Sequence, residues 1–198
     1  MPLPRRSFLK SAASVVPVGC PTLGALLSLR LGWDAKPTHA QVLSAPASDL
    51  HVVPAGGDRL GAPHSMGISS LAFKVLSADT GGNLFVIEHS HLVPGGPPLH
   101  LHLHQDEWFY VMEGEVAFQV ADQRVTLKPG ESVLGPRRVP HAFSSLAPQS
   151  RMLIAFTPAG MMEKFFLDGA ADPALALTPE FMSRYEMQWL GPSPFAKA

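Results

Sequence analysis

A succession of short segments rich in β-branched and aromatic residues runs from residue 71 to residue 158, and it limits the folds open to this chain. The segments are LAFKVLS (71–77), NLFVIEHSHLV (83–93), EWFYVME (107–113), EVAFQVA (115–121), QRVTLK (123–128), SVLGP (132–136) and RMLIAFTP (151–158). Short turn-forming sequences such as Glu113-Gly114 and Pro129-Gly130 separate them. Strands of about six residues joined by such turns predict an antiparallel meander that closes into a barrel or a sandwich.

The composition supports a single all-β domain. Of the 198 residues, 46% are hydrophobic and only 16% are charged, so the chain can bury a substantial core and is not disordered. The 20 prolines and 17 glycines are spread along the chain, which favours many short strands joined by turns over long helices.

The regions before and after the expected barrel core (71–157) have different patterns. Residues 41–70 carry turn formers with little periodicity, which predicts an extended arm with one short strand at 50–53. Residues 158–198 are expected to form a C-terminal helical extension and a terminal strand. MMEKFFLDG (161–169) has helical spacing, PEFMSRYEM (179–187) predicts a second short helix capped by Thr178, and EMQWLGP (186–192) predicts the strand.

Residues 1–40 resemble an export signal. Arg5 and Arg6 precede a weakly apolar stretch, and the sequence from Arg5 to Lys10 resembles the twin-arginine consensus. This resemblance implies a protein that is periplasmic or secreted, with cleavage after Ala40 or after Ala47. A basic N-terminal helix is the alternative interpretation of the same residues.

No stable membrane anchor is expected in this segment. Pro17, Pro21, Gly24 and Arg30 interrupt any apolar run long enough to span a bilayer. Lipidation of Cys20 is an alternative, although Pro17 stands where lipoprotein sites usually have leucine. Because Cys20 is the only cysteine, an exported chain without it forms no internal disulfide and must be stabilised by packing.

The exported chain would be acidic. Residues 1–40 hold five of the 15 Lys and Arg residues and one of the 16 Asp and Glu residues, which leaves a formal charge of −5 on the remainder. A chain with this balance is poorly suited to phosphate backbones, so nucleic acid is not an expected partner.

Four residues have a spacing that can bring metal-binding atoms together. His100 and His102 are two apart in an extended segment, so their imidazoles project from the same face. Glu107 opens the next strand, and His141 follows close enough in a meander to return on a neighbouring strand. Three imidazoles and one carboxylate suit a divalent transition metal, whether Fe, Mn, Ni, Co, Cu or Zn.

HLHLHQDEWFYVMEG (100–114) resembles the first motif of the cupin superfamily. In that motif two histidines one residue apart are followed after three or four residues by a glutamate, and after six more by a glycine. Here four residues separate His102 from Glu107, and six separate Glu107 from Gly114.

PGESVLGPRRVPHAF (129–143) resembles the second cupin motif, and QWLGP (188–192) is similar to the C-terminus of quercetin 2,3-dioxygenase-like single-domain cupins. The resemblance implies one antiparallel β-barrel of the jelly-roll type and favours a homodimer. It also implies that the metal ligands are His100, His102, Glu107 and His141.

Two positions depart from the second motif. Arg138 stands where the family usually has glycine, and Ser145 stands where it usually has asparagine. Arginine disfavours the positive φ that glycine adopts easily. We therefore expect the loop before His141 to be shaped differently or to present the guanidinium to an anionic substrate.

Three further histidines lie near the motif. A register built on His102 and His104 leaves only two residues before Glu107, so His104 is expected in the strand connection. There it would support a metal ligand, carry protons at the pocket mouth or be a solvated loop residue. His89 and His91 form another pair on one strand face, but no carboxylate follows at a suitable spacing. A surface or rim position is expected for both.

The pocket wall is expected from residues near the ligands. Phe109 and Val111 share strand parity with Glu107, and Phe118 and Phe143 lie on neighbouring segments. Barrels of this size are filled mainly by side chains, so each of these four residues either lines the pocket or belongs to the core.

The resemblance implies an exported metal-dependent dioxygenase that acts with dioxygen on an aromatic or enolisable small molecule. Glu107 would also be catalytic, as the base that takes the substrate's proton, which is favoured if an apolar wall raises its pKa. The alternatives are a metal-dependent isomerase, decarboxylase or lyase of a small oxo acid or sugar, and a cupin that binds a small ligand without turnover.

Overall fold

The computed structural model of the protein describes residues 50–147 and 149–196. The expected export signal, its cleavage after Ala40 or Ala47, and lipidation of Cys20 all concern residues outside these ranges. Within them, no helix is both long enough and apolar enough to cross a bilayer.

Eleven strands and three short helices make up this part of the chain. They are β1 (His64–Ser65), β2 (Ser70–Val75), the 3-10 helix η1 (Ser77–Thr80), β3 (Phe85–Leu92), β4 (Leu99–His102), β5 (Asp106–Glu113), β6 (Val116–Val120), β7 (Gln123–Leu127), β8 (Ser132–Gly135), β9 (His141–Ser145), β10 (Ser150–Thr157), α1 (Met162–Ala171), α2 (Pro179–Ser183) and β11 (Met187–Gly191).

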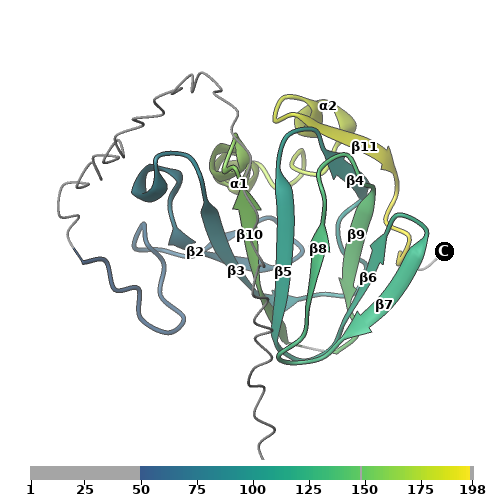
Figure 1. The fold of residues 1–198 in the computed structure, drawn as a ribbon, viewed down its shortest axis with the longest axis horizontal. Helices are drawn as coiled ribbons and strands as arrows, with labels where there is room; N and C mark the ends of the chain where they lie inside the picture. Colours follow the sequence, from purple (N-terminus) through teal and green to yellow (C-terminus); the bar gives the residue numbers. More distant parts are fainter. Residues whose placement is uncertain (1–49, 148, 197–198) are drawn as a thin grey trace, which may run out of the picture. The chain divides into compact units, whose positions relative to one another are not determined.

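The strands form two antiparallel sheets (Figure 1). One has the order β1-β2-β3-β10-β5-β8, and the other has the order β11-β4-β9-β6-β7. Figure 1 shows α1 and α2 at the same end of the strands. The predicted all-β fold, an antiparallel barrel of the jelly-roll type with short C-terminal helices, is confirmed.

Alternation along the strands fills the space between the sheets. On β10, Met152, Ile154 and Phe156 are buried while the residues between them are partly exposed, as the two-residue period of a strand requires. Phe109 and Val111 on β5 are fully buried against them. The core is therefore continuous across the neighbouring strands of the first sheet.

One local expectation is wrong, and one predicted helix is present but shorter than its segment. Residues 50–53 form no strand, and the short strand of this region is β1. The second helix ends at Ser183, because the chain adopts a left-handed conformation at Glu186 (φ 60°) and then enters β11, where Met187 pairs with His102. Thr178 does cap this helix, since its hydroxyl accepts a hydrogen bond from the Phe181 amide at 3.3 Å.

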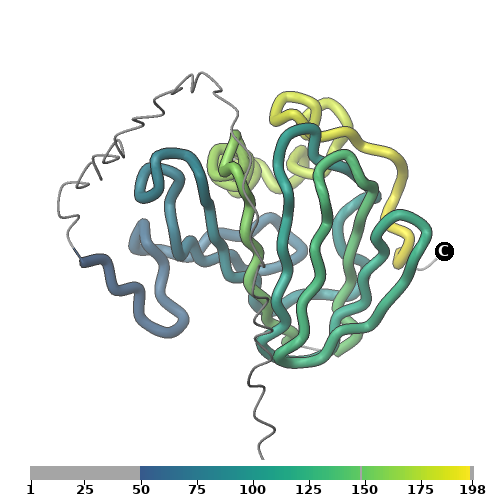
Figure 2. The backbone as a smooth tube through the Cα atoms, in the orientation of Figure 1, coloured from purple at the N-terminus to yellow at the C-terminus, as the bar shows by residue number. Residues whose placement is uncertain are grey.

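The C-terminal strand joins the second sheet as an outer strand. Figure 2 shows the yellow end of the chain, which contains β11, crossing to the far side of the barrel from β2 and β3. It pairs with β4, with Gln188 opposite Leu101 and Trp189 opposite His100. The expected C-terminal extension therefore completes the sheet that carries the histidine run.

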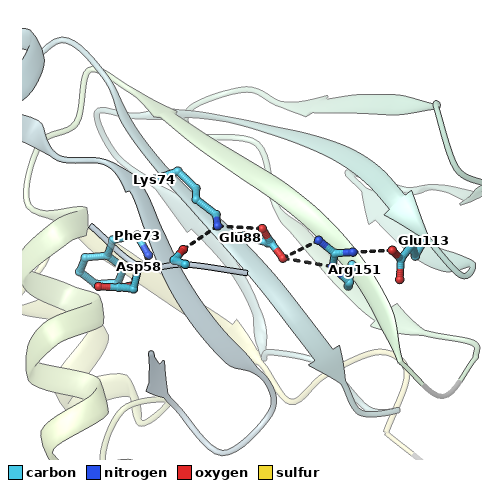
Figure 3. Close-up of polar contacts among 7 residues, drawn as sticks. Asp58, Phe73, Lys74, Glu88, Glu113 and Arg151 are labelled. Carbon is cyan, nitrogen blue, oxygen red and sulfur yellow. Dashed lines mark hydrogen bonds and ion pairs between the residues drawn. The ribbon is translucent and has the colours of Figure 1, made fainter. Parts of the chain in front are cut away.

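A row of charges ties together four adjacent strands of the first sheet (Figure 3). Lys74 on β2 lies 3.0 Å from Glu88 on β3, Glu88 lies 2.9 Å from Arg151 on β10, and Arg151 also contacts Glu113 on β5. Burial raises the pKa of Glu88, but the hydrogen bonds from Lys74 and Arg151 outweigh it, and the pKa lies below its ordinary value.

Replacing Glu88 with glutamine is expected to lower the free energy of unfolding by about 1–2 kcal/mol at about pH 7. Because the folded protein depresses this pKa, the stabilisation is present above the ordinary value of 4.5 and is lost as the pH falls through the folded value. Urea unfolding of both proteins at about pH 7 and about pH 3 measures the difference. It should shrink at the lower pH.

Glu113→Gln is the matched control, because it removes a carboxylate from the same Arg151 but at a side chain that is 55% exposed. It should cost less than about 0.5 kcal/mol. A loss in Glu88→Gln that stays the same at both pH values would show that charge plays no part in it.

Candidate metal centre

Four side chains from three strands converge inside the barrel. They are His100 and His102 on β4, Glu107 on β5 and His141 on β9, and we call them the His/Glu cluster. One nitrogen or oxygen atom from each lies within 4.8 Å of those of the other three. None of the four is more than 6% exposed. The structure thus brings together all four residues named as ligands from the sequence, while metal binding by them stays a prediction.

Strand pairing positions these side chains. His100 lies directly opposite His141 across the β4–β9 pair, with ring centroids 4.7 Å apart. His102 is two residues along β4, so its ring projects from the same face. Glu107 lies opposite Gly135 on β8, and a Cβ at Gly135 would be 3.1 Å from His141 Nδ1. A side chain at position 135 would therefore crowd the His141 ring, and glycine leaves room for it.

Backbone carbonyls orient two of the imidazoles. Nδ1 of His100 lies 2.8 Å from the Pro98 carbonyl oxygen, and Nδ1 of His141 lies 3.0 Å from the Val139 carbonyl oxygen. A carbonyl oxygen only accepts, so each Nδ1 carries a proton and donates it. Nε2 of both rings is then the atom left for the cluster, which is the arrangement that metal-binding histidines commonly have.

Glu107 faces the rings of His102 and His141. Oε2 of Glu107 lies 2.7 Å from Nε2 of His141 and 3.0 Å from Nε2 of His102. Since Nδ1 of His141 already donates to Val139, a hydrogen bond from Nε2 to Glu107 makes this ring an imidazolium. Burial lowers the pKa of His141, but the hydrogen bond to Glu107 outweighs it, and the pKa is raised.

His102 supplies a test of whether a cation fits the cluster. Both ring nitrogens are buried without a hydrogen-bond partner, because the 3.0 Å approach to Glu107 lacks hydrogen-bond geometry. A buried polar atom with no partner costs free energy. A divalent cation among the Nε2 atoms and the carboxylate would give Nε2 of His102 a partner. The residues present therefore fit the metal that the sequence predicts.

The charge states of His100 and Glu107 also fit a cation, whereas His141 would have to give up its Nε2 proton to bind one. Burial, followed by the nearby rings of His141 and His102, lowers the pKa of His100 to about 3, so this ring is neutral and offers a lone pair. Burial raises the pKa of Glu107, but His102 and His141 outweigh it and hold the pKa below its ordinary value. The expectation that an apolar wall raises this pKa is therefore wrong. Glu107 is a carboxylate because His141 donates a hydrogen bond to it and the ring of His102 lies beside it.

An apolar cavity of about 40 Å³ adjoins the cluster. Three of the cluster residues line it, together with His89, and the rest of its wall is formed by Met66, Ile68, Pro97, Phe143, Ile154, Phe156, Met162, Phe165, Phe166, Leu177, Met182 and Met187. Of the four residues considered from the sequence, only Phe143 lies in the wall. Phe109, Val111 and Phe118 belong to the core.

Much of the wall comes from the C-terminal region, which the sequence did not connect with the site. Met162, Phe165 and Phe166 on α1 and Met182 on α2 close one side of the cavity. The helical spacing in α1 predicts that these residues face inward. It does not say which surface they cover, because that depends on where the chain returns after β10.

Arg138 contradicts the expectation for its loop. It adopts a φ of 63°, the left-handed conformation that glycine would adopt, and its amide donates to the His102 carbonyl oxygen at 2.7 Å. Its Nε donates to the Leu103 carbonyl oxygen at 3.3 Å. The side chain is exposed and does not line the cavity, so it offers no guanidinium to a substrate there.

His104, His91 and His89 differ in burial and in their distance from the cluster. His104 is exposed and lies outside the cluster. His91 is exposed with a φ of 52°, but His89 is only 3% exposed and lines the cavity. A register shift between β3 and β10 at this point breaks the alternation. The expectations that His89 and His91 share a face, and that His89 is a surface or rim residue, are therefore wrong.

Comparison with known proteins connects this geometry with a family. Residues 88–156 match the cupin domain, and this segment contains the whole His/Glu cluster. No curated protein shows significant similarity to the chain.

Several solved structures are similar to part of the barrel. KdgF from Halomonas sp. is 17% identical, with 50% of this chain and 87% of that chain covered and a TM-score of 0.44. An RmlC-like cupin from Shewanella frigidimarina NCIMB 400 is 19% identical, with 50% and 84% covered and a TM-score of 0.44. An oxalate decarboxylase from Lactobacillus farciminis is 18% identical, with 49% and 31% covered and a TM-score of 0.43.

Proposed function

We propose that this chain, which carries a cupin domain over residues 88–156, is a metal-dependent dioxygenase of a small, neutral, enolisable molecule. The observation that carries the proposal is the His/Glu cluster itself, with an unpartnered His102 at the edge of an apolar cavity. Its ligands would be His100, His102, Glu107 and His141, and its metal would be Fe, Mn, Ni, Co, Cu or Zn.

The bound ion would act as a Lewis acid with positions left open for substrate and dioxygen. The chain's own contribution begins with orientation. The carbonyls of Pro98 and Val139 hold two imidazoles with Nε2 inward, and the stacked rings of His102 and His141 lie 5.5 Å apart. Little rearrangement is then needed when the substrate binds.

Glu107 limits which protons can be removed. Its low pKa makes its carboxylate a weak base, so it removes a proton readily only from a group that is already acidic. Enols, β-dicarbonyl compounds and acidic phenols would meet this condition where a bound metal ion, as a Lewis acid, lowers the pKa of the group that loses the proton. A carboxylate oxygen of Glu107 would then hold the substrate's proton within the buried site.

The cavity wall argues against charged and sugar substrates. Apart from the cluster and His89, the described residues around the cavity have only apolar side chains, so no lysine or arginine is present to pair with a carboxylate. An uncharged, largely apolar substrate therefore fits better than an oxo acid or a sugar.

The site of action is part of the proposal. Arg5 and Arg6 in their twin-arginine context support export, and the protein would act in the periplasm or outside the cell. The twin-arginine route carries proteins that fold before export, so the metal would be chosen inside the cell. A homodimer stays a prediction from the resemblance.

Dioxygen uptake tests the proposal. Protein loaded with each candidate metal in turn is expected to consume dioxygen with pentane-2,4-dione when assayed with an oxygen electrode, and to leave the compound unchanged under anaerobic conditions. Catechol and a flavonol serve as larger comparison substrates. His102→Ala, prepared in the same way, should consume none.

Two outcomes would overturn the dioxygenase assignment. Turnover that is equally fast without dioxygen would indicate a lyase, isomerase or decarboxylase. Recovery of every compound intact after long aerobic incubation would indicate a binding protein.

A further inference from the structure

We propose that His89 is a substrate-positioning residue, whose Nε2 forms a hydrogen bond with a polar atom of the molecule held at the His/Glu cluster. This inference rests on the proposed function in so far as the substrate binds in the same cavity. It assigns to β3 a role that the cluster residues on β4, β5 and β9 do not fill.

His89 is a buried polar group that the cluster does not use. It is 3% exposed, and its Nε2 has no hydrogen-bond partner although it is enclosed by the protein. Buried polar atoms in native proteins nearly always have a partner, and one without needs an explanation. Among the described residues that line the cavity, His89 is the only polar side chain outside the cluster. A ligand in the cavity would supply the partner that is missing.

The other ring nitrogen explains why Nε2 can adapt to its partner. Nδ1 of His89 lies 2.9 Å from the hydroxyl oxygen of Ser69, which is itself 5% exposed. A hydroxyl can donate or accept, unlike the carbonyls that face His100 and His141. His89 can therefore present Nε2 either as an N–H donor or as a lone-pair acceptor. This suits recognition of a hydroxyl as well as a carbonyl oxygen.

Aromatic neighbours hold the ring in one plane. His89 makes edge-to-face contacts with Phe143 and Phe166, with centroids 6.1 Å and 5.9 Å apart. Phe143 and Phe166 also line the cavity, so the same contacts connect the ring with the walls around the substrate. Nε2 is then fixed in direction before a ligand arrives, which reduces the entropy lost on binding.

The ring is neutral under ordinary conditions. Burial lowers the pKa of His89 to about 4, against a smaller opposing effect of Glu107. A neutral ring matches the described cavity wall, in which Glu107 of the cluster is the only carboxylate and no lysine or arginine is present. The ligand class that fits is a small uncharged molecule with an oxygen atom for the metal and a lone pair or hydroxyl for His89, with apolar carbons between the aromatic walls.

Ligand binding without turnover tests this role. Protein loaded with Co(II) is titrated anaerobically with pentane-2,4-dione, and the visible absorption of the metal reports the dissociation constant. His89→Phe keeps a ring of similar size and removes the polar atoms. We expect it to weaken binding of the dione about 10-fold, equivalent to ~1.4 kcal/mol, with Co(II) affinity and thermal stability close to those of the parent protein.

Two further variants make the test specific. His89→Gln, which can place an amide near the position of Nε2, should recover part of the lost affinity. His91→Phe is the matched control, because it makes the same replacement on the same strand at an exposed position outside the cavity, and it should bind the dione as the parent does. Should His89→Phe fail to fold, His89→Gln is compared with the shorter His89→Asn, and tighter dione binding by His89→Gln is the expected result.

Several results would overturn the role of His89. One is dione affinity within about twofold of the parent in His89→Phe, or equal affinity in the two amide variants, which would make His89 a packing residue. Another is loss of Co(II) binding in His89→Phe, which would place His89 among the metal ligands. None of these binding measurements depends on dioxygen uptake. The role of His89 can therefore be refuted without refuting the dioxygenase assignment, and the reverse also holds.

Discussion

Replacement of His141 with alanine is expected to remove most of the bound metal while the barrel remains folded. His141 would supply one of four ligands, and its Nε2 lies 2.7 Å from the Glu107 carboxylate. Loss even of a residue that only supports a metal ligand costs about 10- to 100-fold in affinity, so loss of the ligand itself should cost more than about 100-fold. Competition between the protein and a chelator of known Co(II) affinity measures this directly.

The same substitution should have a much smaller effect on the fold. His141 lies opposite His100 at the start of β9. The next residues of this strand, Ala142 and Phe143, are buried and keep their packing. Alanine leaves Glu107 without its hydrogen-bonded imidazolium, so its carboxylate pKa rises and a moderate part of the stability is lost. Circular dichroism should still show a cooperative thermal transition.

His104→Ala is the matched control for metal binding. It removes an imidazole from the same histidine run, but His104 is exposed and outside the cluster, so metal affinity should be unchanged. His102→Ala should behave as His141→Ala does. Full metal occupancy in both His102→Ala and His141→Ala would refute the assignment of the cluster as a metal centre.

Replacement of Gly96 with alanine is expected to destabilise the fold by about 3–5 kcal/mol. Gly96 has a φ of 62°, and a Cβ there would lie 1.6 Å from the carbonyl oxygen of Phe143 and 2.8 Å from its carbonyl carbon. These are backbone atoms of β9, so no side-chain rotation relieves the overlap. Urea unfolding, with the slope checked for a constant value, gives the loss.

Gly81→Ala isolates the cost of the backbone conformation. Gly81 has nearly the same φ, 61°, but a Cβ there would meet no atom within 4 Å. It should cost only about 1–2 kcal/mol. Equal losses in the two variants would mean that the close approach of Gly96 to β9 has no energetic weight.

The strands and the cluster were predictable because they follow from local periodicity. His100 and His102 share a face for as long as β4 is extended, and the turn before Glu107 is too short to place it elsewhere. The return of His141 beside His100 also follows from the order of the hairpins. These relations need only the two-residue period of a strand and the antiparallel return of short turns.

The cavity wall and His89 depend on contacts between distant residues. The register shift between β3 and β10 turns His91 outward while His89 stays inside. No local sequence pattern predicts this shift. Arg138 adopts the conformation of a glycine because its amide is held by the His102 carbonyl, a contact between separate segments. The low pKa of Glu107 likewise depends on rings that only the fold brings to it.

The pairing of β11 with β4 also sets when the site can form. Met187 pairs with His102, so the partner of the histidine strand leaves the ribosome about 85 residues after the histidines themselves. Until then β4 has only a single paired residue with β9, His100 opposite His141. A nascent or prematurely terminated chain would thus hold its histidines on a poorly supported strand, and a competent metal centre would report that synthesis had passed β11.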